Sequence, residues 1–194
     1  MKLQSKPRCA WCAGVPELIA YHDTEWGVPE HDDQRLFEKI CLEVFQCGLS
    51  WRTVLTKREN FRAAFCDFDF YQVADYGPSE VQRLLANSGL IRHRGKIQAV
   101  IHNAARAQEM VLEHGSLAAF IWQYQPDPLT LPPPQSVTLS AESIALSRDL
   151  KRRGWKFVGP TTMFALMQAM GLMNDHEVGC FRRSLIPDAG QLPL

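Results

Sequence analysis

Residues 36–51 of the chain read LFEKICLEVFQCGLSW, and this stretch decides the predicted fold. Its apolar side chains recur at helical spacing, at positions 36, 37, 40, 41, 44 and 45, which predicts one helix with a broad apolar arc. At about 100° per residue, Glu43 lies roughly 20° beyond Leu36, on the shoulder of that arc, whereas Glu38 and Lys39 point well away. This position alone favours a glutamate that reaches solvent. The alternative is a carboxylate in the wall of a ligand pocket, beside Trp51.

The length and the charge of the chain limit its class. Its 194 residues are enough to bury a core, and its formal net charge of zero means that an anionic partner must be met by a local basic patch. No apolar run approaches the roughly 20 residues of a membrane span, and the first residues contain no apolar signal core. We therefore expect a cytoplasmic protein without a membrane partner. Its six cysteines are expected to be thiols or metal ligands, not disulfides.

The remaining segments also favour helices, since few of them alternate apolar and polar residues as strands do. Further helices are expected over residues 51–65, 79–86, 91–113, 141–153 and 161–170, with a short one near 120–122. Asp32 is expected to cap the central helix. Residues 9–26 and 67–77 are expected to be turn-rich connectors, and the proline-rich residues 125–134 a surface crossover. The predicted fold is all-α.

Two pairs of potential metal ligands lie near opposite ends of the chain. Cys9 and His22 come early, and His176 and Cys180, spaced H-x3-C, come late. Zinc binds such thiolates and imidazoles tetrahedrally, and four protein ligands make a closed structural site that would join the two ends of the chain. Cys9 and Cys12 have the spacing of a zinc knuckle and could instead pair with His176 and Cys180. The spacing leaves these sets open, together with the alternative that the residues are unconnected.

Two basic turns, each followed by a predicted helix, favour binding of an anion. The first runs from Gly154 to Gly159, with Lys151, Arg152 and Lys156 around it. Backbone N–H groups at the start of a helix bind phosphate without reading sequence. An ordinary helical hairpin with a glycine C-cap is the alternative, but a second basic turn over residues 92–96 makes phosphate binding the better hypothesis. The expected DNA-phosphate contacts are Arg92, Arg94, Lys96, Val158, Gly159 and Thr161.

Several strings in the chain resemble bacterial 3-methyladenine DNA glycosylase I. They are Cys9, residues 21–27 (YHDTEWG), Leu42-Glu43, residues 48–51 (GLSW), residues 91–97 (IRHRGKI), residues 157–159 (FVG) and residues 174–176 (NDH), in the same order between about residues 8 and 183. That family belongs to the helix-hairpin-helix DNA glycosylases. The resemblance therefore implies two helical lobes around a base pocket, with residues 1–183 as a single compact domain. Residues 184–194 lie outside it and are expected to form a flexible tail.

The resemblance also implies a site. It implies structural zinc bound by Cys9, His22, His176 and Cys180, and a substrate pocket lined by Tyr21, Trp26 and Trp51, with Glu43 as the catalytic group. A flipped, cationic alkylated purine would stack on Trp51, and Glu43 would accept its hydrogen bonds and favour its charge.

The implied activity is hydrolysis of the N-glycosidic bond of 3-methyladenine in double-stranded DNA by a monomeric base-excision repair enzyme. Relatives that also cut the backbone have a lysine where this chain has Thr161, so we expect a monofunctional hydrolase without a Schiff base. The alternatives are a non-catalytic, zinc-containing module that recognises damaged DNA, and a glycosylase with altered alkylpurine specificity.

Four residues leave details of the site open. Phe45 and Cys47 stand where the family pattern predicts a glutamine and an alanine, and Leu18 stands where an aromatic residue often lies near the pocket. Asp175 is expected to support the neighbouring His176, with activation of water as its alternative role. Substrate range is therefore expected to depend on Phe45 and Cys47.

Overall fold

The computed structural model describes residues 6–186, and within that range the chain forms ten α-helices, four 3₁₀ helices and no strand. This confirms the predicted all-α fold. The α-helices are α1 (Pro16–Thr24), α2 (Asp33–Gln46), α3 (Trp51–Leu55), α4 (Arg58–Ala64), α5 (Phe70–Ala74), α6 (Pro78–Ala86), α7 (Arg94–His114), α8 (Leu117–Ile121), α9 (Ala141–Arg152) and α10 (Pro160–Ala169). The 3₁₀ helices are η1 (Ala10–Cys12), η2 (Cys66–Phe68), η3 (Trp122–Tyr124) and η4 (Pro128–Thr130).

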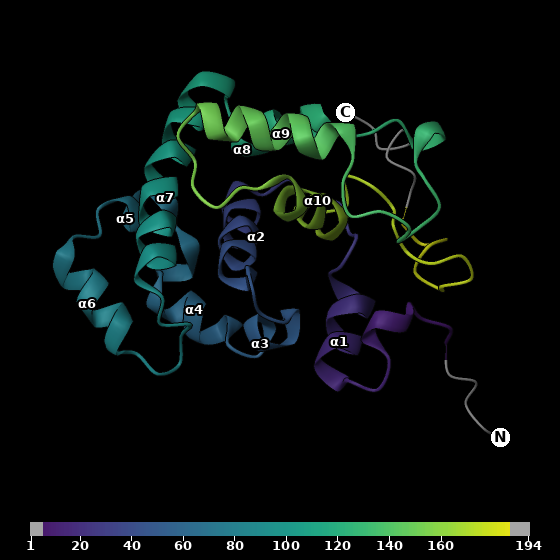
Figure 1. The fold of residues 1–194 in the computed structure, drawn as a ribbon, viewed down its shortest axis with the longest axis horizontal. Coiled ribbons are helices and arrows are strands. Elements are labelled where there is room, and N and C mark those ends of the chain that lie inside the picture. The colour runs from purple at the N-terminus through teal and green to yellow at the C-terminus, as the bar shows by residue number, and fades with distance from the viewer. Residues whose placement is uncertain (1–5, 187–194) are drawn as a thin grey trace.

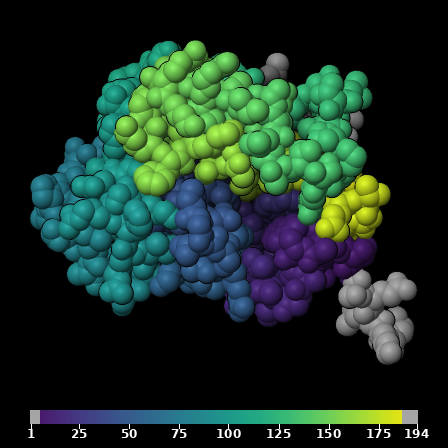
Figure 2. All heavy atoms as spheres, viewed as in Figure 1, coloured from purple at the N-terminus to yellow at the C-terminus, as the bar shows by residue number. Residues whose placement is uncertain are grey.

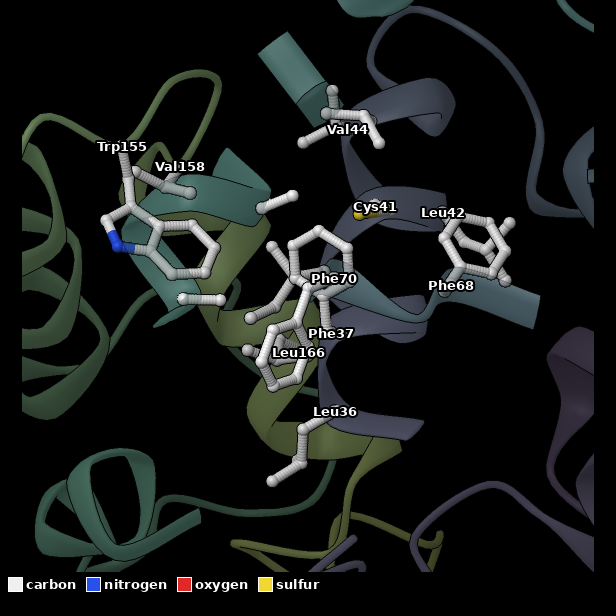
Figure 3. Packing of buried hydrophobic residues seen from close by; sticks show 14 of the residues in the cluster. Leu36, Phe37, Cys41, Leu42, Val44, Phe68, Phe70, Trp155, Val158 and Leu166 are labelled. Atoms are coloured by element: carbon white, nitrogen blue, oxygen red, sulfur yellow. The ribbon is translucent and has the colours of Figure 1, made fainter. Parts of the chain in front are cut away.

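Helix α2 is the central element, with α7 and α10 on either side of it (Figure 1). It starts as predicted, since the Asp32 carboxylate accepts a hydrogen bond from the backbone N–H of Arg35 at 2.9 Å. Its apolar residues form the middle of the main core. Phe37 packs edge-to-face on Phe70 and on Trp155, with ring centroids 5.6 and 6.3 Å apart (Figure 3).

The polar side of α2 is buried as well, because every residue from Leu36 to Phe45 is almost fully shielded from solvent. The prediction that Glu38 and Lys39 point away from the packed side is therefore wrong. The guanidinium group of Arg62 in α4 lies 2.8 Å from Glu38 Oε1. Lys39 forms an ion pair with Glu43, one turn further along α2. Charged side chains can be buried when opposite charges satisfy them, and neighbouring helices provide those charges here.

Several element boundaries differ from the prediction. The segment at 9–26 contains the helix α1, and the connector at 67–77 contains α5, whose N-cap Asp69 accepts from the N–H of Tyr71 at 2.9 Å. The single helix expected over 51–65 is two helices, α3 and α4, separated at Thr56 and Lys57. Helix α7 begins at Arg94, three residues later than expected, because His93 caps it.

The two ends of the described chain lie side by side, purple beside yellow in Figure 2. The N–H of Phe181 donates to the carbonyl of Pro7 at 2.9 Å. The first residues of the expected tail are packed, since Ile186 is buried and its carbonyl accepts from Asn174 at 3.4 Å. Residues 187–194 of that tail lie outside the described residues. Within residues 6–186, no helix combines the length and the apolar character that crossing a membrane requires.

Candidate functional site

A cavity of about 310 Å³ lies against the polar side of α2. All four residues that the sequence analysis placed in a base pocket line it, together with residues that it did not single out, such as Trp11 and Lys39. The lining comprises Trp11, Tyr21, Trp26, Lys39, Glu43, Gln46, Trp51, Gln135, Val137, Thr138, Ala165, Gln168 and Ala169. The structure thus brings together side chains from η1, α1, α2, α3 and α10 with the segment that precedes α9.

Aromatic rings form much of the wall of this cavity. Trp51 is the first residue of α3, and Ser50 fixes the start of that helix by accepting from the N–H of Thr53 at 3.2 Å. The rings of Tyr21 and Trp51 have centroids 5.3 Å apart, and those of Trp11 and Trp26 are 5.2 Å apart. Such a wall suits a flat ligand that stacks on one ring and touches the edges of others.

Three polar atoms of this wall are buried without a hydrogen-bond partner among the described residues. They are Trp11 Nε1, Tyr21 Oη and Trp51 Nε1. Leaving a buried donor unpaired costs about 1–3 kcal/mol, so polar groups of this kind normally have partners. Three such atoms in one aromatic cavity indicate that it is shaped for a ligand with hydrogen-bonding edges.

Glu43 lies in the wall and is paired with Lys39, and each residue has 5% of its surface exposed. The Lys39 ammonium is 2.7 Å from Glu43 Oε1 and 3.4 Å from the centroid of the Trp51 ring. Burial acts to lower the pKa of Lys39, but Glu43 and Tyr21 outweigh it, so the pKa is raised and the side chain remains a cation. Burial raises the pKa of Tyr21, which therefore keeps its proton.

The four predicted metal ligands form one buried cluster in which all ligand atoms lie within 4.8 Å of one another. Cys9 Sγ is 3.5 Å from His176 Nδ1, and Cys180 Sγ is 3.4 Å from His22 Nε2. These separations fit a tetrahedron of thiolates and imidazoles around one small ion. Cys12 is not part of the cluster, because its thiol donates to the carbonyl of Cys9 at 3.1 Å. The residues present therefore fit a metal ion.

The histidines of the cluster are oriented by their other ring nitrogens. His22 Nδ1 donates to the Asp23 carboxylate at 2.9 Å, and His176 Nε2 donates to the carbonyl of Trp26 at 3.1 Å. Such bonds fix the tautomer and point the remaining nitrogen at the centre of the cluster. Because Trp26 also lines the cavity, the cluster supports one of its walls directly.

The two basic turns differ in what they expose. Arg92 and Arg94 are exposed, but Lys96 is buried. The Lys96 ammonium donates to the carbonyls of Phe45 and Cys47, at 3.0 and 2.5 Å. The structure therefore corrects the expectation that Lys96 contacts phosphate. This side chain satisfies carbonyls at the C-terminal end of α2, where a helix lacks internal partners.

The hairpin between α9 and α10 has the predicted glycine-rich turn. Gly154 adopts φ +87°, a left-handed conformation that favours glycine. Val158 is buried and its carbonyl accepts from Ser147 at 2.6 Å, so this residue can offer only its backbone N–H to a ligand. Gly159 is the N-cap of α10, and Thr161 is exposed in the first turn.

The residues expected to tune the pocket do not line it. Phe45 lies in the core on Phe61, with ring centroids 4.4 Å apart, and Cys47 is exposed beyond the end of α2. Leu18 is partly buried outside the cavity lining. Asp175 accepts from Gln168 Nε2 at 2.6 Å and from the N–H of Gln135 at 2.9 Å. Since both glutamines line the cavity, Asp175 supports that wall.

The cavity is also lined by four residues that the sequence did not predict, Trp11, Lys39, Gln135 and Gln168. The position of Trp11 could have been predicted, because Trp11 stands between Cys9 and Cys12 and must lie near any site that these cysteines form. The other three residues could not have been predicted, because nothing in their local sequence distinguishes them from surface residues.

Comparison with known proteins identifies close relatives. The family model described as methyladenine glycosylase matches residues 11–183. The chain is 50% identical to DNA-3-methyladenine glycosylase 1 of Escherichia coli over 182 residues, which are 89% of this chain and 95% of that protein. It is 46% identical to DNA-3-methyladenine glycosylase of Haemophilus influenzae, over 89% of this chain and 96% of that one.

Solved structures agree with these sequence matches. A crystal structure of 3-methyladenine DNA glycosylase I superimposes with a TM-score of 0.83 at 49% identity, over 90% of this chain and 98% of that one. A structure of a variant of 3-methyladenine DNA glycosylase I in complex with 3-methyladenine superimposes with a TM-score of 0.85 at 32% identity, over 91% and 97% of the two chains. The fold is thus shared over nearly the whole chain.

Proposed function

Since the chain belongs to the methyladenine glycosylase family, we propose that it is a DNA repair enzyme that hydrolyses the N-glycosidic bond of 3-methyladenine in double-stranded DNA. The observation that carries this proposal is the cavity itself. Aromatic rings, three unpartnered donors and the Glu43 carboxylate surround a space of about 310 Å³. A flat cationic purine could stack on these rings and present its polar edge to the donors and the carboxylate.

The reaction follows from what these groups can hold. The damaged nucleotide leaves the base stack, which costs a few kcal/mol and least for a damaged pair. Its base stacks on Trp51, and Glu43 accepts hydrogen bonds from the base and favours its positive charge. The C1′–N9 bond then breaks, and its electron pair moves to N9, so that the base leaves uncharged. The sugar cation is captured by water, which loses a proton to the solvent.

The proposal also covers the DNA contacts. Arg92 and Arg94 expose their guanidinium groups on one basic turn, and the helix-hairpin-helix of α9 and α10 offers the backbone N–H groups of Val158, Gly159 and Thr161 on the other. These groups can bind phosphates without reading bases. Thr161 provides no amine for a Schiff base, so the enzyme is a monofunctional N-glycosyl hydrolase.

We propose that the Cys9, His22, His176 and Cys180 cluster holds structural zinc. Two thiolates and two imidazoles close the tetrahedron, and no position remains for a catalytic water. The ion would hold the early and late segments together and thereby fix Trp26 through His176. We also propose that residues 1–183 act as one domain, because the cavity takes its lining from residues 11 to 169, and that the protein is a cytoplasmic monomer.

Chromatographic identification of the bases released from methylated duplex DNA tests the proposed function. Release of 3-methyladenine by the wild-type protein is the expected result, with a Glu43→Gln variant as the matched control. The competing hypothesis is a module that binds damaged DNA without cutting it. DNA binding without base release at high protein concentration would support that module and reject the enzyme.

A further inference from the structure

The best place for a positive charge in the cavity is already taken by a side chain of the protein. Lys39 Nζ lies 2.7 Å from Glu43 Oε1, 3.4 Å from the Trp51 ring centroid and 5.4 Å from the Tyr21 ring centroid. A carboxylate and the face of a tryptophan are the two groups that the proposed cationic base needs. The pocket therefore contains its own cation before substrate arrives.

Lys39 adopts this position although it has alternatives. A lysine has a long flexible stem and usually places its ammonium in water. Here the side chain is 7% exposed and lines two cavities, the large one and an adjoining one of about 190 Å³ that shares Tyr21 and Trp51. Lys39 thus borders two spaces that a ligand can enter, and its pair with Glu43 makes the wall of the larger one neutral overall.

We propose that Lys39 tunes the reaction in this cavity, because its charge weakens binding of the cationic base and speeds the departure of that base. This inference rests on the proposed function of the same cavity. Lys39 neutralises Glu43 in the free protein and stays beside the base when it binds.

The direction of each effect follows from where the charge is before and after cleavage. In the bound substrate the alkylated base is positive, so the Lys39 ammonium repels it and offsets part of the attraction of Glu43. When the C1′–N9 bond breaks, its electron pair goes to N9 and the base becomes neutral, while the positive charge moves to the sugar. The repulsion between Lys39 and the base is thereby lost as the reaction proceeds. An interaction that destabilises the bound substrate more than the transition state raises the rate of the chemical step.

Replacing Lys39 by methionine tests the proposal, because methionine keeps an unbranched apolar stem and removes the charge. Single-turnover release of 3-methyladenine from methylated duplex DNA gives a maximal rate and the enzyme concentration at half that rate. We expect both values to fall about tenfold in Lys39→Met, the pattern of a lost ground-state repulsion. Lys39→Arg, which keeps the charge, is the matched control and should retain both values to within about threefold.

Two further measurements separate this role from a structural one. Inhibition by added 3-methyladenine, a free base without the positive charge of the substrate, should be unchanged in Lys39→Met, and so should binding to undamaged duplex DNA. A lower maximal rate with equal or weaker substrate binding would show that Lys39 only supports Glu43, and would overturn the proposal. If Lys39→Met does not fold, Lys39→Gln removes the same charge but can still donate to Glu43, and the same pattern decides. Absence of base release by the wild-type protein would reject the proposed function instead.

Discussion

Replacing Lys96 by methionine distinguishes two roles that the sequence and the structure give to one side chain. As part of the basic turn at residues 92–96, Lys96 would contact a DNA phosphate. In the structure its ammonium instead donates to the carbonyls of Phe45 and Cys47, at 3.0 and 2.5 Å. We expect Lys96→Met to destabilise the protein and to leave phosphate binding intact.

The expected size of the loss follows from these two bonds. A hydrogen bond from a charged donor contributes about 1.5–3 kcal/mol, and a cation at the C-terminal end of a helix adds a few tenths. Cys47 is exposed, so in the variant water can replace the lysine at the Cys47 carbonyl and reduce the cost of losing that bond. We therefore expect the free energy of unfolding to fall by about 3 kcal/mol in total. For a chain of this size such a loss lowers the melting temperature by about 6–12 °C.

Urea unfolding and the salt dependence of DNA binding measure the two roles separately, and Arg94→Met, on the same turn but exposed, is the matched control. Loss of one phosphate contact lowers the slope of log affinity against log salt by about 1. We expect Lys96→Met to lose stability and keep that slope, and Arg94→Met to do the reverse. A stable Lys96→Met variant with a reduced slope would refute the structural assignment and restore the phosphate contact.

Three further outcomes are expected. Glu43→Gln should slow base release at least about 100-fold, while the free energy of unfolding falls by about 3 kcal/mol because the buried Lys39 loses its ionic partner, as release assays and unfolding curves can show; a variant that simply unfolds would place Glu43 in the core instead. Cys180→Ser should lower zinc content, measured by elemental analysis, together with the melting temperature, and unchanged metal content would remove Cys180 from the ligand set. Asp69→Ala should cost about 1 kcal/mol at neutral pH, because Asp69 caps α5. Hydrogen bonds from Gln72 and Tyr71 lower the pKa of Asp69, so in acid the unfolded state binds more protons. The difference from wild type should therefore begin to shrink as the pH of urea unfolding falls below about 4, and shrink further as Asp69 is protonated in the folded protein.

Much of the fold follows from local sequence. The apolar spacing of residues 36–45 predicts α2, and Asp32 marks its start. The helices at 141–153 and 161–170 were also predicted to within a residue. Helix α1 was missed because its apolar residues do not form one face, and α5 was missed because it is only five residues long. Stability in both depends on packing against the rest of the chain, which local propensity does not describe.

Prediction of which residues lie together succeeded where their chemistry has few other uses. The sequence has two cysteines and two histidines at opposite ends of the chain, with tryptophans close to them, and one shared site accounts for all of these residues. The structure brings them together. Prediction failed for Lys39 and Lys96, since a lysine in a sequence is usually a solvated cation. Only the positions of Glu43 and of the carbonyls at the end of α2 show that each ammonium has a buried partner.

The burial of the polar side of α2 also changes the interpretation of its pattern. An amphipathic helix normally separates the core from water, and on that basis Glu38 and Lys39 were expected to face solvent. In this protein the apolar side faces the main core, and the polar side faces Arg62 and the cavity wall. Each charge there must have a partner, because a single unpaired one would cost several kcal/mol. A cationic ligand that enters the cavity must therefore fit a set of charges that is already balanced, and we expect its binding to depend on Lys39 as well as on Glu43.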